Sequence, residues 1–279
     1  MKKKLVFHFY IDSNWRTNPI YNLHFKCLRH YRDCFDEAYF AICPEVDDDY
    51  DSIKEVEQKL FNIFNGIGKL EFDIVKNTTL RECPTLKREV VDKLGEDDLV
   101  FFAHSKGVSD LDRKTIEQTT TWVSALYYQS LSHLHGGYDD IVHYLEKEPF
   151  KMSYGSLMVQ FTYHPHINSK YEWYYAGTFF WINSKKLKRY IRNNNITLPE
   201  MSNRYYSENF LGDIFPIKAS IDNEKHEEMY LAWAKNGRYI LCSNVNGAEI
   251  EDFMAYGFEN EDDRQGFYNF LDYITNLEE

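Results

Sequence analysis

A histidine, a serine, a lysine and a glycine follow directly on a short apolar run. The run covers residues 99–103, and the four residues are His104, Ser105, Lys106 and Gly107. An apolar run that ends in a turn signal is typical of a buried strand, and open α/β sheets bind ligands beyond the carboxyl ends of their strands. A lysine there is a point cation for phosphate, and a glycine lets backbone N–H groups approach the same anion. The four residues therefore predict a phosphate-binding site.

A second candidate lies in the aromatic segment 174–181, which Gly177 interrupts. Glycine within a strand marks a bulge or a close approach of ligand or backbone. Thr178 beside it is a candidate to point into a cleft. Phe179 and Phe180 are expected in the core. Trp181 is also expected there, and it is kept as a candidate for ligand contact.

A third candidate is the pair Arg204 and Glu208, which are four residues apart in a segment expected to be helical. At that spacing the two side chains can form a surface ion pair. A glutamate held in a cleft could instead act as a general base. Both interpretations stay open at the level of sequence.

Two His-x-His pairs have the residue types of metal ligands but lack the partner spacing of a zinc site. They leave a metal-dependent hydrolase open as an alternative function. The chain has no GxGxxG, GxxxxGK[ST] or GxSxG motif, which disfavours a Rossmann dehydrogenase, a P-loop NTPase and an α/β-hydrolase. The pairs are His133 and His135, which lie close to Asp139 and Asp140, and His164 and His166.

The composition limits the classes of partner. The 279 residues carry a net charge of −12, which disfavours binding to a nucleic-acid polymer. Aromatic residues make up 17% of the chain, and tyrosine suits contacts with sugars and nucleobases. The five cysteines are scattered and form no CxxC pair, which predicts reduced thiols in a cytoplasmic protein.

No membrane-spanning segment is expected, because no run approaches the roughly 20 apolar residues that a span needs. The first ten residues are expected to form a buried strand rather than a signal peptide, since His8, Asp12 and Asn14 interrupt the apolar stretch. Peripheral association with a membrane stays open.

Strands and helices alternate through the first half, which predicts an α/β domain with a mainly parallel sheet. Strands are expected at 5–10, 37–43, 69–75 and 99–103, with helices at 21–31, 52–65 and 85–93 between them. Ser52 and Glu55 fit a capping box at the start of the second helix. Further helices are expected at 115–133, 138–145, 184–193, 203–211 and 262–276, strands and loops at 150–181, and a strand pair near 229–243. We expect one domain over 1–219, with halves 1–114 and 115–219, and an α+β extension over 220–279 packed on it.

The order of these motifs resembles bacterial glycosyltransferase-like proteins of polysaccharide gene clusters, which are similar to the GT-A superfamily. The resemblance covers roughly residues 5–215. It runs through 104–107, a helix with Trp122, the segment 176–181, and Arg204 with Glu208. Each motif is weak alone, and their order and spacing are more specific.

The resemblance implies a GT-A-like, Rossmann-type mixed sheet flanked by helices, with an aromatic-rich acceptor half. A nucleotide-sugar donor would bind at the strand ends, with its diphosphate at the motif 104–107, chiefly at His104 and Lys106. A glycan acceptor would lie on the second half, near Gly177, Thr178, Trp181 and Arg204. Glu208 would activate or orient the acceptor hydroxyl, and Asp139 and Asp140 are alternatives for that role.

The sequence departs from this family in two places. Thr178 stands where an asparagine is expected after the glycine, and His-Ser-Lys replaces the usual Asp-x-Asp that holds Mg²⁺ or Mn²⁺. Asp110 and Asp112 are weak candidates for that metal, and Lys106 could supply its charge instead. These departures leave a noncatalytic glycan- or nucleotide-binding module open.

Overall fold

The structure is a computed structural model that describes most of the chain. The described residues are 1–47, 49–96, 99–108, 116–133, 137–149, 152–156, 158–160, 173–175, 177–198, 200–201, 204–214, 239–241 and 261–277. The elements up to β4 are β1 (Lys3–Ile11), α1 (Pro19–His30), η1 (Arg32–Cys34), β2 (Glu37–Pro44), α2 (Tyr50–Phe64), β3 (Lys69–Ile74), α3 (Cys83–Leu86), η2 (Lys87–Val91) and β4 (Leu99–His104). The later elements are α4 (Ile116–Leu131), α5 (Tyr138–Lys147), β5 (Ser153–Gly155), β6 (Met158–Gln160), β7 (Trp173–Tyr175), β8 (Phe180–Asn183), α6 (Ser184–Asn193), α7 (Tyr206–Ile214), β9 (Tyr239–Leu241) and α11 (Glu261–Asn276).

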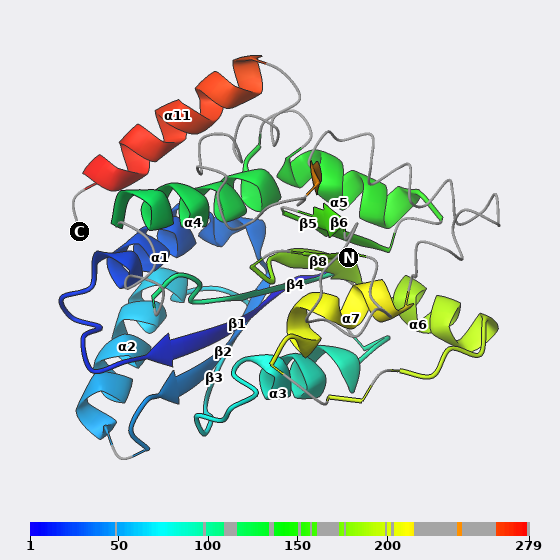
Figure 1. The fold of residues 1–279 in the computed structure, drawn as a ribbon, viewed down its shortest axis with the longest axis horizontal. Coiled ribbons are helices and arrows are strands. Elements are labelled where there is room, and N and C mark those ends of the chain that lie inside the picture. The colour runs from blue at the N-terminus through cyan, green and yellow to red at the C-terminus, as the bar shows by residue number, and fades with distance from the viewer. Residues whose placement is uncertain are drawn as a thin grey trace.

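A six-stranded mixed sheet, in the order β3-β2-β1-β4-β8-β5, forms the centre of the molecule (Figure 1). The first four strands in this order are parallel to one another, whereas β8 is antiparallel to both β4 and β5. The expected α/β class with a mostly parallel, helix-flanked sheet is therefore confirmed, and it is compatible with a Rossmann-like fold. Strands from both halves of the chain contribute to this one sheet.

Helices cover both faces of the sheet, and the strands bury alternate residues on each face. In β1, Leu5, Phe7 and Phe9 pack in the cluster that contains α1, α2, α4 and α5, whereas Val6 packs in the cluster that contains α3, α6 and α7. His8 points to the same side as Val6. The alternation therefore places His8 on the α3 and α7 face, at the carboxyl end of the strand.

The C-terminal helix α11 forms an outer layer on α1 and α4 (Figure 1). Phe270 stacks near Tyr31 and Tyr128, at ring-centroid distances of 5.5 and 5.4 Å. A second sheet has the order β7-β6-β9. The sequence predicted a pair of strands near 229–243, and the part of this region that the structure describes is the strand β9. No helix in the described ranges is both long and apolar enough to cross a bilayer.

The start of α2 differs from the expected capping box. The N-cap is Asp49, whose side chain accepts a hydrogen bond from the backbone N–H of Ser52 at 3.2 Å. Glu55 instead forms an ion pair with Arg16 at 2.9 Å. The helix therefore begins before Ser52, because the carboxylate of Asp49 satisfies an otherwise unpaired N–H group.

We expect Asp49→Ala to lower the free energy of unfolding by about 1 kcal/mol, the usual contribution of an N-cap side chain. Hydrogen bonds from Ser52 lower the pKa of Asp49. Its stabilisation is therefore present above the carboxyl's unfolded pKa and is lost as the pH falls through the folded one. Urea unfolding at neutral and acidic pH measures both effects. Asp51→Ala, in the same first turn, is the control. An equal loss in both variants would contradict the capping role.

Candidate functional site

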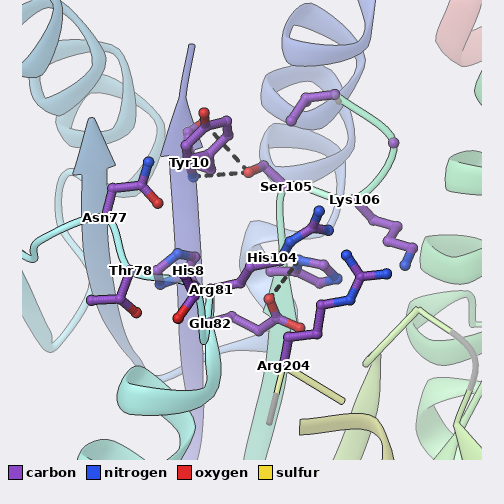
Figure 2. A pocket seen from close by; sticks show the side chains of 13 residues that line it. His8, Tyr10, Asn77, Thr78, Arg81, Glu82, His104, Ser105, Lys106 and Arg204 are labelled. Carbon is purple, nitrogen blue, oxygen red and sulfur yellow. Dashed lines mark hydrogen bonds and ion pairs between the residues drawn. The ribbon is translucent and has the colours of Figure 1, made fainter. Parts of the chain in front are cut away.

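A cavity of about 530 Å³ lies at the carboxyl ends of β1 and β4 (Figure 2). The chain passes from β1 to β2 and β3 on one side of β1, while β4 lies on the other side. The strand order thus reverses between β1 and β4, and such a switch point is where open α/β sheets bind ligands. The cavity is lined by residues from the two strand ends, from the loop after β3 and from the segment before α7: His8, Tyr10, Asn77, Thr78, Thr79, Arg81, Glu82, His104, Ser105, Lys106, Gly107, Val108 and Arg204.

Three cations from different parts of the chain line this cavity: Arg81, Lys106 and Arg204. Figure 2 shows their side chains directed toward the same region. Besides burial, both Lys106 and Arg81 lower the pKa of His104, so each of these two cations lies within electrostatic reach of that ring. In a chain with a net charge of −12, this local positive group suits an anionic ligand.

Lys106 is held at the cavity wall with only 18% of its side chain exposed. Its ammonium nitrogen lies 3.5 Å from Glu208 Oε1 and 5.0 Å from the centre of the Trp122 ring. The sequence left open an ion pair between Arg204 and Glu208, but the structure pairs Glu208 with Lys106 instead. Arg204 precedes α7 and stacks on Tyr205, with its guanidinium carbon 4.6 Å from that ring.

Glu208 is suited to accept a proton. Burial raises the pKa of Glu208, Lys106 opposes that rise, and the nearby carboxylate of Glu82 adds to it. The backbone N–H of Gly177 also donates to the Glu208 carboxylate. A carboxylate whose pKa moves toward neutrality is better matched to general base catalysis.

His104 and Glu82 form a buried pair below the cations. His104 Nδ1 lies 3.8 Å from Glu82 Oε2, and His104 Nε2 donates to the carbonyl of Gly177 at 3.0 Å. Burial lowers the pKa of His104 to about 4, so the ring is neutral near pH 7. Burial opposes ionisation of Glu82, but the charge that His104 carries when it is protonated, at acidic pH, and a hydrogen bond from Ser207 hold the pKa of Glu82 below its usual value. His104 thus acts as a hydrogen-bond donor rather than as a cation.

Ser105 and Gly107 shape the backbone around Lys106. The hydroxyl oxygen of Ser105 accepts the backbone N–H of Tyr10 at 2.9 Å, which ties the end of β4 to β1. Gly107 has φ +85°, and an added Cβ would approach the Thr119 methyl to 2.6 Å. A side chain at this position is therefore excluded by both conformation and space.

His24 supports the same loop from the opposite face of the sheet. Its Nε2–H donates to the carbonyl of Lys106 at 2.9 Å, so its Nδ1 accepts from the Tyr127 hydroxyl at 2.8 Å. The side chain is fully buried, and burial lowers its pKa to about 3. The loop that carries Lys106 is therefore fixed by a neutral histidine.

The turn between β7 and β8 reaches the site through its backbone. Gly177 has φ +94° and Thr178 has φ +59°; the carbonyl of Gly177 accepts from His104, which lines the cavity, and its N–H donates to Glu208, which lies beside Lys106. Thr178 is fully buried and its hydroxyl has no hydrogen-bond partner in the described part of the chain. Trp181 is also fully buried and donates to the carbonyl of Ser130 at 3.0 Å. Neither side chain offers surface to an acceptor in this structure.

Asp139 and Asp140 lie at the other edge of the sheet. They begin α5, and the neighbouring Tyr138 donates to the carbonyl of Cys34, just ahead of the amino end of β2. Asp139 Oδ2 instead pairs with His133 Nδ1 at 2.9 Å on the surface. The structure therefore does not bring these two carboxylates to the cavity, in contrast to the role expected for them.

The same region contains a Cys-His-Asp arrangement. The Cys34 sulfur lies 4.0 Å from His133 Nε2, on the far side of that ring from Asp139. Burial raises the pKa of the Cys34 thiol to about 12, so it is a poor nucleophile near neutral pH. The four cysteines in the described ranges, Cys27, Cys34, Cys43 and Cys83, are free and buried.

Several candidate metal ligands lie outside the described residues, namely Asp110, Asp112, His135, His164 and His166. In the part of the chain that is described, no three His, Cys, Asp or Glu residues are grouped to hold a metal ion. The carboxylates in and beside the cavity are already engaged, Glu82 by Ser207 and Glu208 by Lys106. The described wall, with Arg81, Lys106 and Arg204, suits an anion.

Sequence reasoning missed the loop after β3, which contributes Arg81 and Glu82 to the cavity. The signal was present, because the polar segment 75–82 follows a strand parallel to β1. The carboxyl ends of parallel strands meet at one edge of a sheet. Neither a comparison with protein-family models nor a search of curated proteins finds a match for this chain.

We expect the stability of the protein to decrease as the pH falls from 6.5 toward 4. Burial lowers the pKa of His8 to about 4, and it lowers those of His24 and His104 likewise, from 6.5. The unfolded chain therefore binds protons in this window that the folded chain does not. Replacing His24 by Gln should reduce the slope of unfolding free energy against pH by about 1.4 kcal/mol per pH unit.

Urea unfolding between pH 5 and pH 7.5 measures that slope. His143, which is exposed on α5, gives the matched control variant, His143→Gln. A wild-type slope in the His24→Gln variant would show that His24 is not a buried neutral group.

Proposed function

We propose that this chain is a glycosyltransferase of GT-A-like type, which transfers a sugar from a nucleotide-sugar donor to a glycan acceptor in surface polysaccharide synthesis. The observation that carries the proposal is the position of Lys106 in the cavity at the switch point, beside Glu208 and with two arginines near it. The cavity volume of about 530 Å³ is within the range for small-molecule sites.

The cations suit the leaving group of this reaction. When the bond between the sugar carbon and the phosphate oxygen breaks, negative charge builds up on the departing diphosphate. Lys106, Arg81 and Arg204 face the space in which that charge would develop. Fixed cations in a partly dry cavity stabilise such charge more effectively than water does.

Glu208 suits the other half of the reaction. The acceptor hydroxyl loses a proton as it forms the new bond to the sugar, and a carboxylate with a raised pKa can take that proton. Lys106 contacts Glu208 in the free protein. A diphosphate that draws the ammonium away would raise the affinity of Glu208 for a proton further, which couples donor binding to base strength.

A panel of UDP-, GDP- and CDP-sugars, incubated with the protein and candidate glycans, tests the proposal. Mass spectrometry of the released nucleoside diphosphate and of the extended glycan reports turnover. We expect one donor class to be consumed only when its acceptor is present. Binding of nucleoside diphosphates without turnover of any donor would favour the noncatalytic binding module instead.

We expect Lys106→Ala to weaken the binding of nucleoside diphosphate by about 10- to 100-fold, the effect of losing one charge-assisted contact. Calorimetric titration with UDP, GDP and CDP measures the affinity. Lys59→Ala is the matched control, because Lys59 also lies over an aromatic ring, that of Phe25 at 5.5 Å, but does not line the cavity. Equal affinities in Lys106→Ala and wild type would remove the phosphate-binding role.

We expect Glu208→Gln to reduce turnover by about 10²- to 10⁴-fold, as for the loss of a general base, while donor affinity does not fall, because Lys106 no longer has to leave a carboxylate partner. Steady-state kinetics with the active donor separates the two effects. Asp139→Asn tests the alternative base. Wild-type turnover is expected there because Asp139 lies at the other edge of the sheet, and a comparable loss would return the role to it.

A further inference from the structure

The Glu82 carboxylate lies in the wall of the cavity, and the proposed reaction assigns it no catalytic step. Only 5% of the residue is exposed, and it stands directly before α3. A buried carboxylate costs free energy unless its oxygens are satisfied. The two carboxylate oxygens of Glu82 lie near Ser207 and His104, and each of these residues is in turn connected to Glu208.

One oxygen holds the start of α7. Glu82 Oε1 accepts a hydrogen bond from the Ser207 hydroxyl at 2.7 Å, and Ser207 precedes Glu208 in the first turn of α7. Ser207 is fully buried. The contact therefore fixes the backbone that carries Glu208.

The other oxygen leads to the same residue by a second route. Glu82 Oε2 faces His104 Nδ1 at 3.8 Å, and His104 Nε2 donates to the carbonyl of Gly177. The N–H of Gly177 donates to Glu208. We call these residues, Glu82, His104, Gly177, Ser207 and Glu208, the Glu82 network; it closes on itself across α3, β4, the β7–β8 turn and α7.

We propose that Glu82 is a positioning residue for Glu208: its hydrogen bond with Ser207 holds the first turn of α7, and its negative charge acts on the Glu208 carboxylate. The inference rests on the proposed role of Glu208 as the base. Glu82 also lines the cavity, so the test reads the protonation of Glu208 directly rather than through substrate binding.

The charged and titratable groups around the network are few in the described ranges. Glu208 faces Lys106 and Glu82, Glu82 faces His8 and His104, and His104 also faces Lys106 and Arg81; Cys83 follows Glu82 in the chain. Lys106 lowers the pKa of Glu208, and Glu82 raises it. Replacing Glu82 by Gln keeps the size and an oxygen that can accept from Ser207, but removes the charge that opposes Lys106.

The test is a titration of the full-length protein with ¹³C-labelled glutamate side chains, in which Glu208→Gln identifies the Glu208 signal. We expect Glu82→Gln to lower the titration midpoint of Glu208 by about one pH unit, the effect of a nearby like charge. The control is Glu89→Gln, because Glu89 is as buried as Glu82 but pairs with Arg88 and Lys93. An unmoved midpoint, or an equal shift in the control, overturns the inference.

A reciprocal measurement covers the case in which Glu82→Gln does not fold. Coupling between two sites is mutual, so Glu208→Gln must lower the midpoint of Glu82 by the same amount. An unmoved Glu82 midpoint in that variant overturns the inference just as directly.

Turnover supplies a readout that a purely structural role would not move. We expect the acid limb of the pH dependence of turnover in Glu82→Gln to shift to lower pH by the same amount as the Glu208 midpoint. The titration needs no substrate. A coupled midpoint in a protein that consumes no donor would reject the proposed function alone, and turnover without the coupling would reject this inference alone.

Discussion

The ammonium group of Lys106 lies 3.5 Å from the carboxylate of Glu208 at a point where each side chain is less than one-fifth exposed. Neither charge is stable there alone, because a buried charge without a partner costs several kcal/mol. The pair therefore constrains its surroundings: His24 must hold the Lys106 loop, and Gly177 must hold Glu208. A ligand that replaces one partner changes the proton affinity of the other, so binding and acid–base chemistry are linked at this site.

The sheet explains why these groups meet. Parallel pairing of β1 with β4 sets His8 opposite His104, so both strands end at the cavity. Because β8 is antiparallel to β4, the first residues of β8, rather than its last, lie at the edge of the sheet where β4 ends. The Gly177 turn, which precedes β8, is therefore brought beside the end of β4 although it lies far along the chain.

Local signals in the sequence predicted much of this arrangement. The helix expected at 184–193 is α6 with the same bounds, because its polar and apolar residues follow one helical face. The place of residues 104–107 at the cavity was predictable because an apolar run that ends in polar residues marks both a strand and its exposed end. Glu82 was missed because its role depends on Ser207 and His104, which no sequence spacing connects to it.

For the two aspartates of α5, the residue type suggested a role at the site, whereas their position lies away from the cavity. Asp139 and Asp140 have a suitable residue type, but residue type does not reveal at which edge of the sheet a helix begins. The sequence could not decide whether Trp181 contacts a ligand, since an aromatic ring suits a core as well as a binding surface. In the structure its indole N–H donates to the carbonyl of Ser130 inside the core.

The order of the elements along the chain also has a consequence for synthesis on the ribosome. The four parallel strands are complete at His104, whereas β8 and α7 follow much later. Domains begin to form from the N-terminal side while translation continues. A nascent chain can thus assemble the ends of the parallel strands while Glu208 is still absent, and Lys106 lacks its carboxylate partner until α7 has been made.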